Sequence, residues 1–94
     1  MAELSLFVGM YDIAEESTRY KIRHLLYGYG VRGQYSVFDC WLDQVMRKQL
    51  HSQLQSLLQS SSDRIVLARI LFPKRIHSLD KQPGLIPADY FYIG

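Results

Sequence analysis

The stretch LSLFVGMYD, from Leu4 to Asp12, indicates how the chain is built. Apolar side chains occupy both alternating sets of its positions, and a strand that is apolar on both faces is typical of the centre of a sheet. The stretch ends at Asp12, after which the apolar residues no longer alternate and recur at helical intervals instead. We therefore expect a central strand here, with the other elements arranged around it.

Two segments have the spacing of amphipathic helices. In residues 13–30 apolar side chains recur at helical intervals, Ser17 is a candidate N-cap, and Gly28 and Gly30 mark the end. A second helix is predicted to begin after Asp43, another candidate N-cap, and its stripe of leucines runs out in a serine loop.

Three further segments are extended. GVRGQYSVFDCWL, from Gly30 to Leu42, alternates like a strand, and Gly33 predicts either a bulge or a bend that splits it into two short strands. DRIVLARILF, from Asp63 to Phe72, is rich in β-branched residues, and the tail ends in the aromatic strand pattern DYFYIG. Strands mixed with two helices predict an α+β two-layer sandwich in which both helices cover one face of a mostly antiparallel sheet.

Length and composition limit the classes of protein. A chain of 94 residues that is 48% hydrophobic predicts one folded domain, and a net charge of +2 is too small for a protein that coats nucleic acid indiscriminately. Cys40 is the only cysteine, which favours a reducing compartment. The apolar run from Leu4 to Met10 is too short to span a membrane and has no signal-peptide features. These features predict a cytoplasmic protein without a membrane partner.

Most side chains that could carry chemistry have a simpler interpretation. The three histidines lack metal-ligand spacing, and no phosphate-binding loop, dinucleotide motif or serine-hydrolase elbow is present. No histidine near Cys40 would activate it, so an inert buried thiol is expected. Phe7 and Tyr35 are interpreted as core residues, and Arg47 and Lys48 as part of a solvated helix face.

Asp12 is the exception, because it lies where an apolar strand ends and a helix follows. A carboxylate held there by a rigid scaffold can bind Mg²⁺, which prefers oxygen ligands and engages phosphate oxygens. The alternative is a helix cap or turn residue. The residues alone leave both interpretations open.

Three features together resemble the CRISPR-associated protein 2 family. They are YDI at residues 11–13, Arg19 seven residues after the aspartate, and GVRGQYSVFD at residues 30–39, in which Arg32-x-Gln34-x-Ser36-Val37-Phe38 is followed by an acid. The resemblance implies a ferredoxin-like βαββαβ fold that forms a homodimer. A single domain is expected over residues 1–94, with a core at 1–80 and a tail at 81–94. We expect the tail strand to pair with the sheet of the other subunit, and residues near it to contact the partner, because an unpaired aromatic edge strand would invite aggregation.

The resemblance further implies a prokaryotic protein of CRISPR spacer acquisition that binds double-stranded DNA and bridges copies of the CRISPR-associated protein 1 integrase. It implies a metal-dependent endonuclease acting on RNA or DNA, with Mg²⁺ or another divalent cation bound by Asp12 as the catalytic residue. Arg19, Lys21 and Arg32 would bind nucleic acid, and Gln34, Ser36 and Phe38 would support them. Single-stranded RNA is a further expected nucleic-acid partner. The alternative function is a toxin-like, metal-dependent endoribonuclease that acts without a CRISPR partner.

Overall fold

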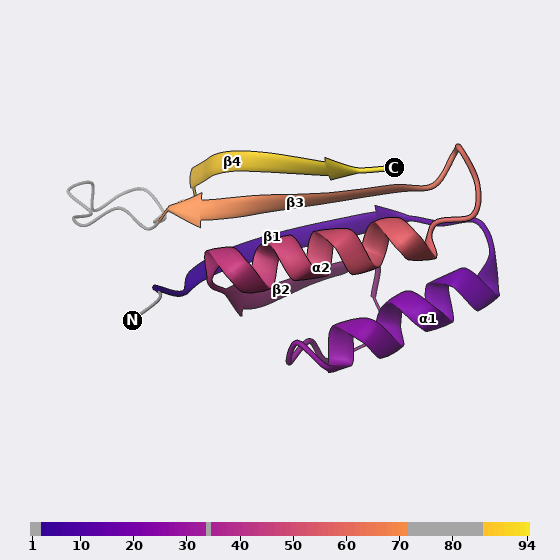
Figure 1. Cartoon of the computed structure of the whole chain (residues 1–94), viewed down its shortest axis with the longest axis horizontal. Helices are drawn as coiled ribbons and strands as arrows, with labels where there is room; N and C mark the ends of the chain where they lie inside the picture. Colours follow the sequence, from indigo (N-terminus) through magenta and orange to yellow (C-terminus); the bar gives the residue numbers. More distant parts are fainter. Residues whose placement is uncertain (1–2, 34, 72–85) are drawn as a thin grey trace, which may run out of the picture.

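The computed structural model describes residues 3–33, 35–71 and 86–94, which form one sheet and two helices (Figure 1). The elements are β1 (Ser5–Asp12), α1 (Glu16–Tyr27), β2 (Val37–Leu42), α2 (Gln44–Leu57), β3 (Arg64–Leu71) and β4 (Ile86–Ile93). The strand order is β2-β1-β3-β4, and all three neighbouring pairs are antiparallel. The prediction of an α+β two-layer fold is confirmed, as is the central position of β1.

The ferredoxin-like pattern is varied at one place, because a single strand lies between the two helices. Residues 31–36, which would supply the other strand, are irregular where the structure describes them, and Gly33 has a φ of +98°. That backbone conformation favours glycine and turns the chain out of an extended path. Of the two alternatives predicted for Gly30–Leu42, a bend is observed, and only its second half forms a strand.

The tail strand β4 has a partner within its own chain and lies at the edge of the sheet, so its expected pairing across a dimer stays a prediction. β4 pairs with β3 of its own chain, with Ile93 opposite Ile65 and Phe91 opposite Leu67. Ile93 is 1% exposed and belongs to the core cluster. The antiparallel ladder and this burial give the strand a partner within the chain, so the tail strand is part of the domain's core.

The core lies between the helices and one face of the sheet. Alternate residues of each strand point to the helices, including Phe7, Cys40 and Leu67, and meet Ile22 of α1 and Leu50 of α2. Both helices lie on this side in Figure 1. The Asp43 carboxylate accepts a hydrogen bond from the Met46 amide at 2.7 Å, which confirms the predicted cap of α2. The cap of α1 is Glu15 instead of Ser17, which lies inside the helix.

Within the part of the chain that the structure describes, no helix covers the opposite face of the sheet. Large apolar side chains on it are more than half exposed: Met10, Val37, Trp41, Tyr90 and Tyr92. We call this surface the open face. Within the described residues, no helix is long and apolar enough to cross a membrane.

Candidate functional site

Asp12 is the last residue of β1 and lies on the open face. Side chains alternate along the strand, so Tyr11 is buried beneath the helices while Met10 and Asp12 are exposed on the other side. In the part of the chain that the structure describes, the Asp12 carboxylate has neither a hydrogen bond nor an ion pair. Its oxygens are therefore available to a ligand.

Arg64 is the residue opposite Asp12 on β3, and it does not neutralise the carboxylate. Its guanidinium donates hydrogen bonds to the carbonyl oxygens of Ser61 and Asp63, at 2.5 and 3.0 Å, and so is bound to the loop before β3. A cavity of about 380 Å³ lies beside these two residues, and its other lining includes Met10, Val66 and Tyr92. Asp12 is thus an unpaired acid at the rim of a mainly apolar hollow.

Arg19 fixes the loop that follows Asp12. Its Nη1 donates to the carbonyl oxygens of Ile13 and Ala14, both at 2.8 Å, from its position in the first turns of α1. Charged donors make strong hydrogen bonds, so this contact holds the backbone next to Asp12 in one conformation. Arg19 therefore has a structural contact in addition to its predicted binding role.

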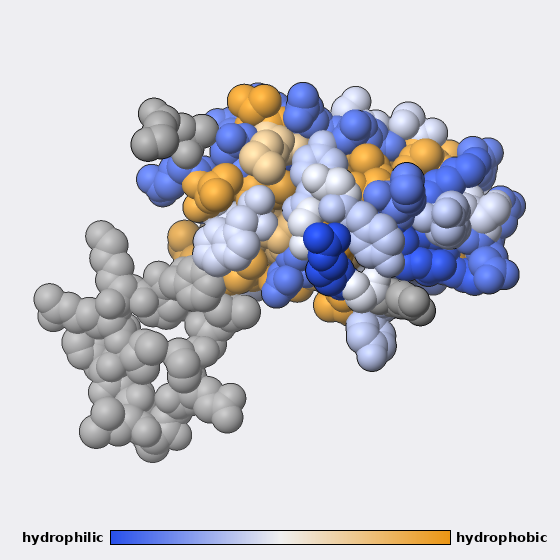
Figure 2. Space-filling view, turned by 90° about the horizontal axis from the view of Figure 1, so that it is seen from below, coloured by the Kyte–Doolittle hydropathy of each residue, from blue (hydrophilic) through white to orange (hydrophobic). Residues whose placement is uncertain are grey.

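Lys21 and Arg32 are exposed, and Lys21 lies apart from Asp12. Lys21 lines a hollow between α1 and α2, together with Tyr20, His24 and Gln53, on the helical layer. Asp12 lies on the open face, so the sheet separates the two. Figure 2 views the side of the molecule where α1 and β2 lie, and shows hydrophilic residues interrupted by hydrophobic patches.

The supporting positions differ in their surroundings. Gln34 lies outside the described residues. The Ser36 carbonyl oxygen accepts a hydrogen bond from the Tyr11 amide at 2.9 Å, which joins the segment before β2 to the end of β1. Phe38 is 7% exposed and packs against Tyr11, with ring centroids 6.3 Å apart. The ring also lies across Gly9, so Phe38 is a core residue.

Of the two aromatic residues interpreted from the sequence as core residues, one is buried and the other is exposed. Phe7 is 3% exposed, as expected, but Tyr35 is 84% exposed, and its assignment to the core was wrong. The chain leaves the sheet before Val37, so the strand alternation that suggested burial does not extend to Tyr35.

Cys40 is buried on β2. Burial raises the pKa of its thiol from 9.0 to about 11, and the neighbouring Asp39 carboxylate acts in the same direction. A thiol with a raised pKa is a poor nucleophile near neutral pH. The expectation of an inert thiol agrees with these surroundings.

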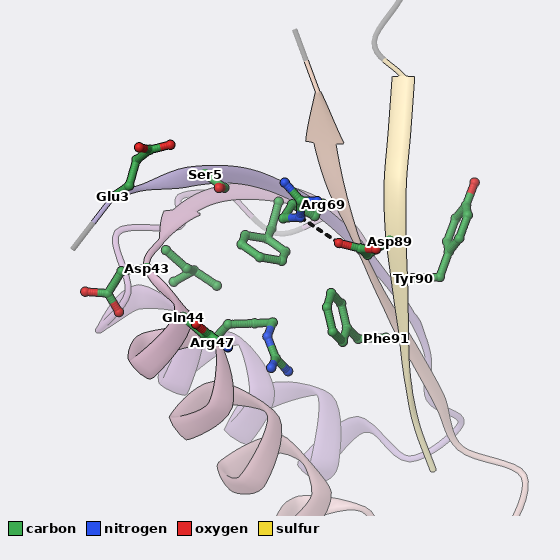
Figure 3. A pocket seen from close by; sticks show the side chains of 11 residues that line it. Glu3, Ser5, Asp43, Gln44, Arg47, Arg69, Asp89, Tyr90 and Phe91 are labelled. Carbon is green, nitrogen blue, oxygen red and sulfur yellow. Dashed lines mark hydrogen bonds and ion pairs between the residues drawn. The ribbon is translucent and has the colours of Figure 1, made fainter.

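Sequence reasoning missed a second group of side chains, at the other end of the sheet. Arg47 packs over the ring of Phe91, 4.1 Å from its centroid, and Arg69 pairs with Asp89 at 2.7 Å (Figure 3). Arg47 is thus bound to an aromatic ring, and its assignment to a solvated face was wrong. No local pattern links it to Phe91, because only the pairing of β3 with β4 brings the tail to α2.

A metal would need more ligands than the described residues gather. Among the described residues, no group of three or more histidine, cysteine, aspartate or glutamate side chains could hold a metal ion. The donor set at Asp12 is a single carboxylate. Its hard oxygen atoms suit Mg²⁺, but the site is incomplete without a ligand from elsewhere.

Comparisons with known proteins agree with these features. The family model described as CRISPR associated protein Cas2 matches residues 5–72. A protein of Thermodesulfovibrio yellowstonii named CRISPR-associated endoribonuclease Cas2 1 is 33% identical over 89 residues, covering 95% of this chain and 97% of that protein. CRISPR-associated endoribonuclease Cas2 3 of Synechocystis is 42% identical over 60 residues, covering 64% of this chain and 65% of that protein.

A solved structure extends the similarity to the fold. The crystal structure of a hypothetical protein from Thermus thermophilus superimposes with a TM-score of 0.69 at 28% sequence identity. The match covers 87% of this chain and 100% of that chain.

Proposed function

Since the chain belongs to the CRISPR associated protein Cas2 family, we propose that it is a homodimeric, metal-dependent endonuclease that also binds duplex DNA during spacer acquisition. The observation that carries the proposal is the unpaired Asp12 carboxylate on the open face. The names of the relatives support a nuclease, since both are called endoribonucleases.

The dimer forms through the open face. Five large apolar side chains are exposed together on one side of the sheet, and a monomer rarely leaves such a patch uncovered. A second copy presents the same face, as a two-fold interface requires, and two sheets pack about 10 Å apart. Dimerisation therefore covers Met10, Val37 and Tyr92.

The same two-fold axis supplies the missing ligand. Asp12 lies on the open face, so a dimer built on that face presents two Asp12 carboxylates. These two side chains would hold the divalent cation, which, when bound, activates water and neutralises charge on a phosphate. Arg19 keeps the backbone next to Asp12 fixed. The apolar side chains of Met10 and Tyr92 beside the site limit the access of bulk water to it.

Lys21 and Arg32 contribute to nucleic-acid binding through phosphate contacts. Both are exposed, and cations that contact backbone phosphates give binding that is weakly dependent on sequence and strongly dependent on salt. In spacer acquisition the dimer would present the duplex to the CRISPR-associated protein 1 integrase. The family membership supports this partnership.

The test is nuclease activity of the purified chain on single-stranded RNA and on duplex DNA, with Mg²⁺ and with a chelator. Asp12→Asn removes the charge with little change in shape. Asp39→Asn is the matched control, because Asp39 is another exposed acid on the same sheet face. We expect Mg²⁺-dependent cleavage by the wild type and by Asp39→Asn, and a loss of at least 100-fold in Asp12→Asn.

Light scattering on all three proteins separates a lost ligand from a lost dimer. Cleavage by dimeric Asp12→Asn at the wild-type rate would contradict the proposed role of Asp12. Absence of cleavage by every protein, on both substrates, would contradict the enzyme and leave only the DNA-binding part of the proposal.

A further inference from the structure

A cavity of about 560 Å³ lies at the end of the sheet away from Asp12 (Figure 3). The start of β1, the end of β2 and the first turns of α2 enclose it on one side, and β3 and β4 on the other. β1 begins here at Ser5 and ends at Asp12, so the strand separates the two sites by its whole length. The proposed nuclease function makes no use of this cavity.

The cavity has an apolar base. Phe7 and Leu42 are 3% and 0% exposed, and their side chains point from the sheet toward α2. Phe91 comes from β4, and its ring lies 6.1 Å from that of Phe7. In Figure 3, Tyr90 points away to the other side of β4, so the aromatic base consists of the two phenylalanines. This surface suits an aliphatic or aromatic group.

Arg47 gives the cavity an unneutralised cation. Its guanidinium carbon lies 4.1 Å from the centre of the Phe91 ring, and a guanidinium stacked on a ring keeps the donors at its edge exposed. Within the described ranges, no carboxylate pairs with Arg47, and the one ion pair joins Arg69 to Asp89. Arg47 is therefore a preorganised donor for a planar anion, next to the apolar base.

The remaining charges decide which kind of anion fits. Glu3, Asp43 and Asp89 also line the cavity, and they outnumber the two arginines. Asp89 neutralises Arg69, and Asp43 caps α2. A nucleic-acid backbone would bring many phosphates close to these three acids, which would repel them. A single carboxylate can contact Arg47 without approaching the three acids.

We propose that this cavity is a docking pocket for a segment of a partner protein that presents a carboxylate beside an aromatic or aliphatic side chain. The carboxylate binds the edge of Arg47, and the apolar group packs on Phe7 and Phe91. An aromatic side chain in an enclosed pocket with a charge-assisted hydrogen bond is the usual composition of a strong interface contact.

The test uses a small probe with the same two groups, 3-phenylpropionate, titrated into the full chain and followed by backbone amide shifts. The uncharged 3-phenylpropionamide is its matched control, and inorganic phosphate represents the nucleic-acid anion. We expect saturable shifts at Gln44 and Phe91 with a dissociation constant on the order of millimolar for the carboxylate. The amide should bind roughly tenfold more weakly.

Two variants locate the site. Arg47→Gln should weaken binding of 3-phenylpropionate roughly tenfold, while Lys48→Gln, which changes the next residue on α2, should leave it unchanged. Amide spectra of both variants establish that they are folded. Lack of saturable shifts, equal binding of the amide, or equal binding by Arg47→Gln would each overturn the proposal. Tighter binding of phosphate than of the carboxylate would overturn the assignment to a protein partner.

Discussion

Replacing Gly9 with alanine should destabilise the fold, although the same change usually stabilises a strand. Alanine in a strand is favoured over glycine by about 0.5–1 kcal/mol, because glycine loses more conformational freedom on folding. At Gly9, however, an added Cβ would lie 2.4 Å from Cζ of Phe38 and 2.7 Å from Cδ2 of Leu67. Carbon atoms normally pack at about 3.5–4.0 Å, so the ring would have to retreat by about 1 Å.

The Phe38 ring has little room to retreat. It is 7% exposed, it packs against Tyr11, and Leu67 beside it is 0% exposed. Overpacking a close-packed core costs about 1–3 kcal/mol, which exceeds the entropic gain. We expect Gly9→Ala to lower the free energy of unfolding by about 2 kcal/mol and the Tm by roughly 8–16 °C.

The assay is thermal and urea unfolding followed by circular dichroism, on Gly9→Ala, Phe38→Leu and the double variant. Leucine lacks the Cζ that the new Cβ would meet, so Gly9→Ala should cost clearly less in the Phe38→Leu background. A Tm of Gly9→Ala equal to or above that of the wild type would refute the packing argument. Strictly additive effects in the double variant would refute the assignment of the clash to the ring.

Three further predictions concern the cap, the thiol and the open face. Asp43→Ala removes the bond to the Met46 amide and should lower the free energy of unfolding by about 1 kcal/mol in urea; no change would show that this cap does not stabilise the fold. The pKa of Cys40 rises from 9.0 to about 11, so its thiolate fraction at pH 8 falls roughly 100-fold. Alkylation of Cys40 should therefore be at least roughly 100-fold slower in the native protein than in denaturant. Equal alkylation rates would contradict the burial of the thiol. Met10→Glu places a charge on the open face and should give a folded monomer by light scattering, whereas a stable dimer would place the interface elsewhere.

The arrangement of the strands could be predicted where hydrophobic pattern alone decides it. β1 is apolar on both faces and lies inside the sheet, and both helices bury their apolar stripes, so periodicity was a sufficient guide. The partner of β4 could not be predicted in this way. A short aromatic strand pairs equally well with its own chain or with another copy, and the choice depends on how Ile93 fits into the core.

The position of Asp12 followed from the sequence, because the end of a strand is visible as a change in spacing. The exposure of Tyr35 could not be predicted from the sequence. The strand-like alternation of side chains extends through Tyr35, whereas the backbone joins the sheet only at Val37. Arg47 and Phe91 meet only through tertiary structure. Neither residue has a neighbour in the sequence that would indicate the contact.

The central claim is that two Asp12 side chains, one from each subunit, form a single site. The most direct measurement is the nuclease activity of wild-type chain unfolded and refolded together with an equal amount of Asp12→Asn, so that subunits mix at random. If both carboxylates are required, only wild-type homodimers cut. The activity should then fall to about one quarter of that of wild-type protein alone at the same total protein concentration. An activity of about one half would show that each subunit works alone and would contradict the shared site.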